Sequence, residues 1–212
     1  MHYPGKILIP APHGQLEASY RPISAPGHRG AVVLHPHPLY GGTMHNKVVF
    51  HAARALQEAG FSTLRFNFRG VDESTGAHGN GIGEVEDARI ALDYLLDAEP
   101  GLDTALVAGF SFGAAVGLRF GATEARVDRL IAIGTPVGVG RLFDAELLAR
   151  SAKPMLFVHG GRDELAPIAA VRSLLASLPP GFPARLVEIP AATHFFDDHL
   201  DELRAAIAEF VG

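Results

Sequence analysis

A chain of 212 residues that is 48% hydrophobic and 19% charged has the composition of a folded globular protein, and its length allows one α/β core to be buried. A formal net charge of −5, with no clustered Lys/Arg run, argues against a nucleic-acid-binding protein. The absence of cysteine excludes a disulfide framework, a thiol nucleophile and a thiolate metal site.

No apolar run approaches the roughly 20 residues that span a bilayer. The first residues, MHYPGKILIPAPHG, lack the basic segment and long apolar segment of a signal peptide. We therefore expect a cytoplasmic protein that does not insert into a membrane. Because no repeat, low-complexity tract or linker interrupts the chain, residues 1–212 are predicted to form a single domain.

Along the chain, short segments that are apolar throughout, or in which apolar and polar residues alternate, are followed by longer amphipathic segments. A hairpin is predicted first, from Lys6–Pro10 and Gln15–Arg21. The later predicted strands are Ala31–Leu34, Phe61–Phe68, Ala105–Phe110, Arg129–Ile133, Pro154–Val158 and Ala184–Ile189. The predicted helices are Lys47–Ala59, Glu84–Leu96, Phe112–Gly121, Leu142–Arg150, Pro167–Leu178 and a closing helix with Leu200, Leu203, Ile207 and Phe210 on its apolar face. This alternation predicts an α/β fold, with a mostly parallel sheet of about seven to eight strands and helices on both faces.

The pentapeptide Gly109–Gly113, with the pattern G-x-S-x-G, joins the predicted strand Ala105–Phe110 to a helix rich in small residues. In that context the central Ser111 sits on a sharp turn with its hydroxyl exposed at the end of the sheet. Glycine on both sides removes Cβ atoms that would clash in so tight a bend. Ser111 is therefore the candidate nucleophile.

A serine hydroxyl needs a base that takes its proton and an acid that orients the base, both from loops at the carboxyl ends of parallel strands. Asp163 follows the predicted strand Pro154–Val158 within the segment GGRDELAP and is the favoured acid. Asp144 is the alternative, but it lies well beyond the end of its strand and within a predicted helix.

Eleven histidines are available, and most are expected to be structural. His194 lies between the last strand and the last helix, so the chain order Ser111, Asp163, His194 favours it as the base. His199 is the nearby alternative and falls inside the predicted closing helix. His159 lies at a strand end, where a ring more often packs or caps the backbone.

Negative charge that develops on a carbonyl oxygen needs N–H donors, which form an oxyanion hole. The backbone N–H of Phe112 at the start of the helix is one candidate. The second should come from the loop after Ala31–Leu34, where Pro36 and Pro38 have no N–H. His37 is favoured there over Leu39 or Tyr40, and the Tyr40 hydroxyl is a possible substitute.

Two other patterns are weighed and set aside. His35 and His37 point to the same side of a strand, as metal ligands can, but no carboxylate or third histidine lies at ligand spacing nearby. The glycines at 79, 81 and 83 resemble a phosphate-binding loop, yet acidic residues follow them directly and would repel a pyrophosphate. We therefore predict no metal site and no nucleotide cofactor.

Taken together, these segments resemble the α/β-hydrolase superfamily, and more closely the small capless bacterial serine hydrolases related to dienelactone hydrolase. HPHPLYGGTMHNKVV at 35–49 is similar to the oxyanion loop and following helix of that group, and RFNFRGVDESTG at 65–76 to its Arg-Gly loop. GFSFG, GGRDELAP and AATHFF supply its three catalytic positions. Dienelactone hydrolases use cysteine, so their lactone substrate does not carry over. In the Arg-Gly loop, Asp72 and Glu73 stand where members of that group more commonly have a smaller turn that contains glycine.

The resemblance implies a cofactor-independent serine esterase that cleaves small carboxylic esters through an acyl-enzyme. Between Gly134 and Lys153 there is room for only a loop and a short helix, so no cap domain is expected and the site should be shallow. Leu39 and Tyr40, with Phe112, are expected to bind the substrate, beside Phe195 and Phe196, of which at least one belongs to the core. A thioesterase or small peptidase with the same triad, and a non-catalytic binding module, are the alternatives.

Overall fold

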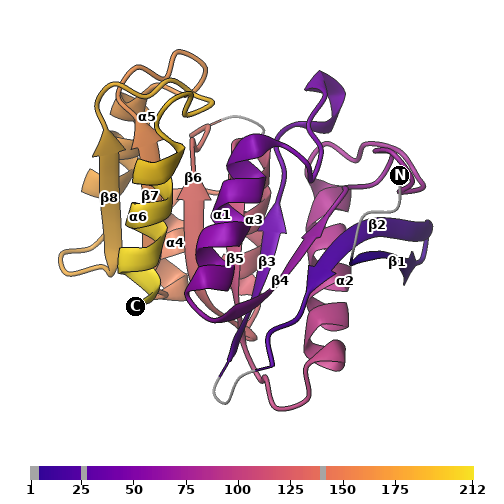
Figure 1. Cartoon of the computed structure of the whole chain (residues 1–212). Helices are drawn as coiled ribbons and strands as arrows, with labels where there is room; N and C mark the ends of the chain where they lie inside the picture. Colours follow the sequence, from indigo (N-terminus) through magenta and orange to yellow (C-terminus); the bar gives the residue numbers. More distant parts are fainter. Residues whose placement is uncertain (1–4, 25–27, 139–141) are drawn as a thin grey trace.

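The computed structural model describes residues 5–24, 28–138 and 142–212, and this part of the chain contains eight strands in a single sheet (Figure 1). The strands are β1 (Lys6–Ala11), β2 (Gly14–Arg21), β3 (Arg29–Leu34), β4 (Phe61–Phe66), β5 (Ala105–Phe110), β6 (Val127–Ile133), β7 (Met155–Gly160) and β8 (Ala184–Ile189). Their order is β1-β2-β4-β3-β5-β6-β7-β8. β2 is antiparallel to both of its neighbours, and all the other pairs are parallel. The predicted mostly parallel sheet is confirmed.

Helices cover both faces of this sheet, as predicted. They are α1 (Lys47–Glu58), α2 (Ile82–Ala98), α3 (Phe112–Thr123), α4 (Ala145–Ser151), α5 (Ile168–Ala176) and α6 (Leu200–Val211), with the short 3-10 helix η1 (Pro38–Tyr40). α1 and α6 pack together on one face, and α2, α3, α4 and α5 contribute to the core on the other (Figure 1). The sheet therefore separates two apolar layers, and the loops at the carboxyl ends of its strands are left free to form a site.

The helices bury apolar stripes against the sheet. Val48, Ala52 and Leu56 of α1 are inaccessible to solvent, as are Leu92 and Leu95 of α2. Full burial of one such Val or Leu side chain contributes about 1.5–3 kcal/mol, so these stripes hold the helices against the sheet.

The strand β4 ends at Phe66, two residues earlier than the sequence predicts. The N–H of Phe68 does not continue the ladder, because it donates to Nε2 of His35 at 2.9 Å. The alternating pattern of this segment is typical of a half-exposed strand, yet all six residues of β4 are buried. The reason is tertiary: β4 pairs with both β2 and β3 and lies beneath α1.

The helix predicted from Leu142 begins instead at Ala145, because the Asp144 side chain accepts the Leu147 N–H at 2.8 Å and caps the helix. No helix within the described ranges combines the length and apolarity needed to cross a bilayer. The cytoplasmic location stays a prediction. Expectations for residues 1–4, for part of the loop 26–30 and for residues 139–141 lie outside the described residues.

Candidate active site

Ser111 stands at the turn between β5 and α3, at the carboxyl edge of the sheet. Its backbone has φ 54° and ψ −119°, a conformation that L-residues rarely adopt, and its N–H donates to the Ile133 carbonyl on the neighbouring strand β6 at 2.8 Å. The predicted sharp strand-to-helix turn is therefore present, and it holds the serine backbone in a strained conformation. Strain of this kind persists only where the surrounding structure enforces it.

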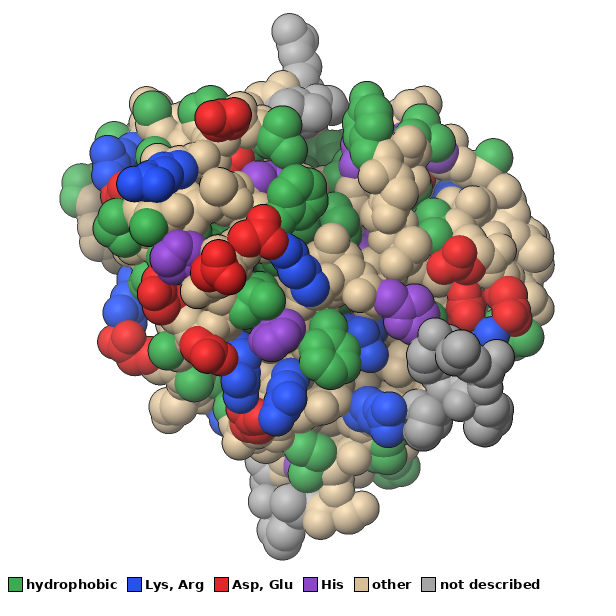
Figure 2. Space-filling view, turned by 45° about the horizontal axis from the view of Figure 1, so that its top comes forward, with side chains coloured by type: hydrophobic (Ala, Val, Ile, Leu, Met, Phe, Trp, Pro, Cys, Tyr) green, Lys and Arg blue, Asp and Glu red, His purple; other side chains and the backbone are tan. Residues whose placement is uncertain are grey.

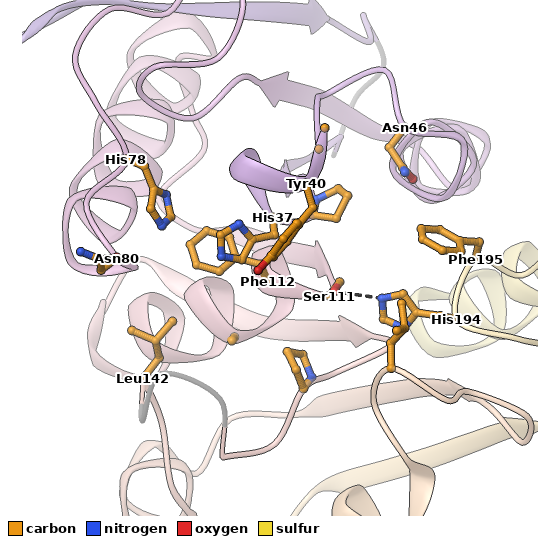
Figure 3. Close-up of a pocket in the computed structure, with 16 residues that line it drawn as sticks. His37, Tyr40, Asn46, His78, Asn80, Ser111, Phe112, Leu142, His194 and Phe195 are labelled. Atoms are coloured by element: carbon orange, nitrogen blue, oxygen red, sulfur yellow. Dashed lines mark hydrogen bonds between the residues drawn. The ribbon is translucent and has the colours of Figure 1, made fainter.

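Gly113 explains why the helix after the serine can start so close to the sheet. A Cβ atom at this position would lie 2.5 Å from the His35 carbonyl oxygen and 2.6 Å from that of Leu34. Glycine therefore lets α3 approach the end of β3 directly. The same approach brings the first turn of α3 against the loop that carries His37 (Figure 3).

Ser111, His194 and Asp163 are joined by two hydrogen bonds, although 83 and 31 residues separate the bonded pairs. His194 Nε2 lies 3.0 Å from Ser111 Oγ (Figure 3), and His194 Nδ1 lies 2.7 Å from Asp163 Oδ2. Since an ionised carboxylate only accepts, Nδ1 carries the proton and Nε2 presents its lone pair to the serine. The arrangement can move a proton from the hydroxyl to the imidazole.

Asp163 is itself fixed in place by the loop after β7. Its other oxygen, Oδ1, accepts the N–H groups of Leu165 at 3.0 Å and Ala166 at 2.8 Å. Burial by itself would raise the pKa of the Asp163 carboxyl, but hydrogen bonds from His194 and Ala166 outweigh burial and hold the pKa below its ordinary value. Asp163 therefore stays ionised beside His194.

Backbone N–H groups that have no partner among residues 5–24, 28–138 and 142–212 flank Ser111 and precede η1. They include the N–H groups of the two predicted donors, Phe112, the first residue of α3, and His37, the residue that precedes η1. Free N–H donors close to a serine are what an oxyanion hole requires. The His37 carbonyl is engaged with Tyr40 and Gly42, which fixes the turn of this loop.

A cleft of about 630 Å³ opens at Ser111, within the size range of sites for small molecules. Figure 2 shows hydrophobic and histidine side chains gathered around a hollow on the face where the parallel strands end. The cleft is lined by Pro36, His37, Tyr40, Gly41, Gly42, Asn46, His78, Asn80, Ser111, Phe112, Ala115, Pro136, Leu142, Leu165, His194 and Phe195. Few of these residues are charged, so shape and a few hydrogen bonds would select the ligand.

The expected substrate-binding residues divide between the cleft and the outer surface. Tyr40 and Phe112 line the cleft, and Tyr40 is 87% exposed at its edge. Leu39 is exposed and does not line the cleft, because η1 turns its side chain outward. Phe195 lines the cleft whereas Phe196 is completely buried, which agrees with the expectation that one of the pair belongs to the core.

The residues considered from the sequence as alternatives to Asp163 and His194, and the histidines considered as metal ligands, have other roles in the structure. Asp144 caps α4, and His199 precedes α6 and bonds to Glu202. His159 bonds to the Ala166 carbonyl, a structural role. Both ring nitrogens of His35 bind backbone groups, namely the Pro36 carbonyl and the Phe68 N–H, and burial lowers the His35 pKa to about 3. The His35 ring is therefore neutral and stabilises the loop by bonding to two backbone groups.

Sequence reasoning missed the contribution of the loop between β4 and α2. His78 and Asn80 from this loop, and Leu142 beyond β6, line the end of the cleft on the far side of Phe112 from His194 (Figure 3). The signal that could have found them is topological. Loops after all parallel strands meet at the same edge of the sheet, and β4 is one of these strands.

Comparison with known proteins identifies the family to which the chain belongs. The family model described as serine aminopeptidase, S33, matches residues 27–152, a range that includes Ser111. Uncharacterized protein RP471 of Rickettsia prowazekii is 35% identical over 209 residues, covering 97% of this chain and 88% of that protein.

Two solved structures are similar over almost their whole length. XC6422 from Xanthomonas campestris, an α/β serine hydrolase without lid, is 36% identical with a TM-score of 0.84, over 97% of this chain and 92% of its own. An α/β serine hydrolase homologue from Coxiella burnetii is 36% identical with a TM-score of 0.87, over 100% of this chain and 99% of its own. The chain therefore belongs to the serine α/β hydrolases and has the capless form of that fold.

Proposed function

We propose that this hydrolase cleaves carboxylic esters through an acyl-enzyme, without a cofactor. The observation that carries the proposal is the pair of hydrogen bonds that His194 makes, donating from Nδ1 to Asp163 and accepting at Nε2 from the Ser111 hydroxyl, at one end of an open cleft. A binding module would have no physical need for a serine hydroxyl, a base and an orienting carboxylate in this relation.

The proposed reaction has two halves, acylation and deacylation of Ser111, and the same groups act in both. Ser111 Oγ attacks the ester carbonyl while His194 Nε2 takes the hydroxyl proton, and the N–H groups of Phe112 and His37 bind the oxyanion. The tetrahedral intermediate collapses as His194 gives its proton to the leaving alkoxide, which departs as the alcohol. Water then attacks the acyl-serine while His194 Nε2 takes its proton. The second tetrahedral intermediate collapses as His194 returns this proton to Ser111 Oγ, the bond between Oγ and the acyl carbon breaks, and the acid is released. Asp163 balances the imidazolium in both halves.

The form of the cleft supports small or surface-presented esters as substrates. Between β6 and β7 the described chain forms the seven-residue helix α4, which is too short to cover a site as a separate cap. Tyr40 and Leu165 at the edge of the cleft are largely exposed, so nothing in the described chain encloses a long acyl chain there. Each buried CH₂ contributes about 0.8 kcal/mol, and an open site forgoes that gain.

Labelling with a fluorophosphonate probe tests the chemistry. We expect one probe per chain, attached to Ser111, together with hydrolysis of p-nitrophenyl butyrate. Ser111→Ala should abolish both, while Ser173→Ala, at an exposed position of α5, should change neither. Absence of labelling would favour the binding-module alternative.

The family model's description makes an aminopeptidase the competing activity. Aminoacyl p-nitroanilides and acyl thioesters should be assayed in parallel with the oxygen ester. The proposal expects the oxygen ester to give the highest kcat/KM. A higher value on the anilide or the thioester would replace the ester assignment while leaving the proposed role of Ser111 intact.

A further inference from the structure

His159 is a completely buried histidine near the carboxyl end of β7, and the proposed reaction gives it no part. Its Nε2 lies 2.5 Å from the Ala166 carbonyl oxygen and 3.4 Å from Oδ2 of Asp163. A carbonyl and a carboxylate only accept hydrogen bonds, so Nε2 carries a hydrogen and donates. This assignment holds for the neutral ring protonated on Nε2 and for the imidazolium alike, so it does not depend on the charge of His159.

The other ring nitrogen of His159, Nδ1, is buried without a hydrogen-bond partner in the described parts of the chain. A buried polar group that lacks a partner destabilises the folded state. An apolar side chain of similar length would fill the same space without an unpaired nitrogen, although it would lose the bond to Ala166. Packing by itself therefore does not explain a histidine at this position, and the explanation lies in the bond that Nε2 makes.

The bond from His159 closes the loop that carries the acid. The Ala166 carbonyl accepts from His159, and the Ala166 N–H donates to Asp163 Oδ1 at 2.8 Å. The Leu165 N–H donates to the same carboxylate oxygen at 3.0 Å. His159 thus ties the far end of the loop 161–166 back to the strand from which the loop starts. Because both N–H groups on Oδ1 belong to this loop, the orientation of the carboxylate depends on the tie.

The loop of the acid and the loop of the base are held together by their backbones. A Cβ atom at Gly160 would lie 2.4 Å from the Ala192 carbonyl oxygen, so only glycine permits this approach. The Arg162 N–H donates to the same carbonyl at 2.9 Å, two residues before His194. These contacts fix the distance between the loops. They leave the rotation of the Asp163 carboxylate about its own side-chain bond to be set by the groups around its oxygens.

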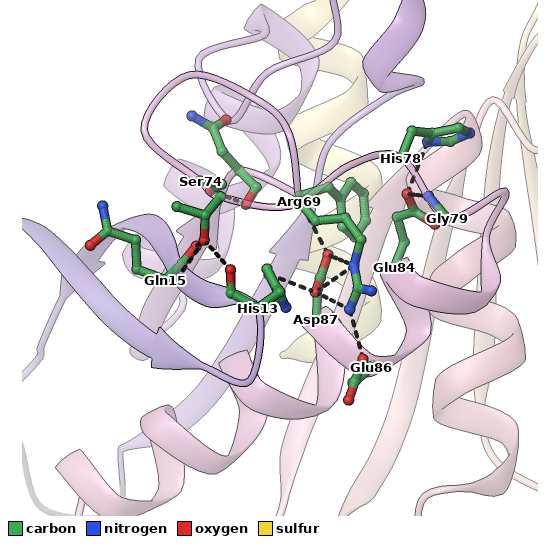
Figure 4. Close-up of polar contacts among 12 residues, drawn as sticks. His13, Gln15, Arg69, Ser74, His78, Gly79, Glu84, Glu86 and Asp87 are labelled. Atoms are coloured by element: carbon green, nitrogen blue, oxygen red, sulfur yellow. Dashed lines mark hydrogen bonds and ion pairs between the residues drawn. The ribbon is translucent and has the colours of Figure 1, made fainter.

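A second buried aspartate, Asp87, shows how differently Asp163 is held. Both carboxylates are inaccessible to solvent. Asp87 receives the backbone N–H of Arg69 at 2.9 Å and its guanidinium at 2.7 Å (Figure 4). Among residues 5–24, 28–138 and 142–212, no arginine or lysine pairs with Asp163, and the side-chain nitrogens near its Oδ2 are those of His194 and His159. Since a buried carboxylate is stable only when donors surround it, His159 stands where a second donor is needed.

We propose that His159 is a positioning residue for the acid: its Nε2–H holds the Asp163 carboxylate in the rotation that presents Oδ2 to His194 Nδ1. The donor acts in two ways, by tying Ala166 and its N–H to Oδ1 and by lying beside Oδ2. The inference deepens the proposed function and rests on it for its kinetic readout. Because His159 does not line the cleft, its loss should leave substrate binding intact and slow the proton transfer to His194.

The first experiment compares His159→Met with His159→Gln, two side chains of similar length of which only glutamine supplies an N–H near the place of Nε2. His159→Met should lower kcat for p-nitrophenyl butyrate by about 10- to 100-fold, as expected for a displaced group, with KM within about twofold of wild type. His159→Gln should stay within about fivefold of the wild-type kcat. The control Gln57→Met removes the donor that Gln57 on α1 gives to Thr63 at 2.6 Å, and should leave kcat unchanged.

The second experiment, ¹⁵N NMR of the imidazole rings, is independent of turnover. In the wild-type protein Nε2 of His159 should carry a hydrogen, and a ring protonated on Nδ1 alone would refute the proposal without any variant. The Nδ1–H signal of His194, assigned by its absence in His194→Gln, should shift in His159→Met. It should return toward the wild-type position in His159→Gln, while circular dichroism shows the same fold in both variants.

The outcomes separate this inference from the proposed esterase. If His159→Met keeps the wild-type kcat and an unshifted His194 signal, or if His159→Gln is as slow as His159→Met, the positioning role is refuted and the esterase stands. The rate at which a fluorophosphonate labels Ser111 covers the converse case. If no ester is cleaved, but labelling is slowed in His159→Met and restored in His159→Gln, the ester assignment fails and the positioning role stands.

Discussion

Replacing Asp163 by asparagine tests whether the carboxylate orients the base. In the Asp163→Asn variant the amide oxygen can keep the bonds that Oδ1 accepts from Leu165 and Ala166. The amide NH₂ then takes the place of Oδ2, 2.7 Å from His194 Nδ1. Two donors cannot face each other, so the ring must move its proton to Nε2. That nitrogen lies 3.0 Å from Ser111 Oγ and can no longer accept the serine proton.

The expected loss in kcat is about 10³- to 10⁴-fold, the cost of the wrong tautomer in a Ser-His-Asp triad. At 1.36 kcal/mol per factor of ten, this is about 4–5.5 kcal/mol of transition-state stabilisation. Steady-state hydrolysis of p-nitrophenyl butyrate measures it, and ¹⁵N NMR of the His194 ring reports the tautomer directly.

Asp144→Asn is the matched control, since Asp144 caps α4 through the Leu147 N–H and asparagine caps helices equally well. Its kcat should equal that of the wild type. A kcat within about tenfold of wild type for Asp163→Asn, or a large loss for Asp144→Asn, would refute the assignment of the acid.

Four further outcomes follow from the same geometry. Both Ser111→Ala and Ser111→Gly should be inactive. In urea unfolding the glycine variant should be more stable than the alanine variant by about 1 kcal/mol, because glycine relieves the positive φ at some entropic cost. Equal unfolding midpoints for the two variants would show that the turn is unstrained. Gly113→Ala should destabilise by roughly 1–3 kcal/mol, since its Cβ would lie 2.5 Å from the His35 carbonyl oxygen, whereas Gly117→Ala, whose Cβ would meet its nearest neighbour at 3.3 Å, should be tolerated. The lowered pKa of Asp163 adds stability above its ordinary value of 3.8, and this stability is lost as the pH falls through the folded-state pKa. The difference in unfolding free energy between wild type and Asp163→Asn should therefore shrink with acidification below about pH 4, and a constant difference would contradict the shift. Among unsubstituted p-nitrophenyl alkanoates, kcat/KM should be highest from acetate to butyrate and decline by decanoate, and a rise toward laurate would show an enclosed acyl tunnel.

Ser111, Asp163 and His194, which are joined at the candidate site, could be predicted from the sequence because each follows a predicted strand in a recognisable local pattern. Ser111 lies between two glycines at the end of an apolar strand, and Asp163 and His194 each follow a later strand. Parallel strands connected by helices must present their carboxyl ends on one edge, so local order along the chain implies nearness in space. The same rule set aside Asp144 and His199, although the structure places both at helix N-termini rather than inside helices.

The remainder of the cleft depends on contacts that no local pattern encodes. His78 sits in a loop without periodicity, and its position is set by Glu84, Arg69 and Asp87 only once α2 has packed on the sheet. The outward turn of Leu39 is likewise decided by the three-residue helix η1. The sequence by itself determined the sheet, the order of its loops and the three candidate residues Ser111, Asp163 and His194, because hydrophobic periodicity and glycine placement act over a few residues. Only the tertiary structure decided which side chains line the cleft, because that depends on how loops distant in the chain pack against one another.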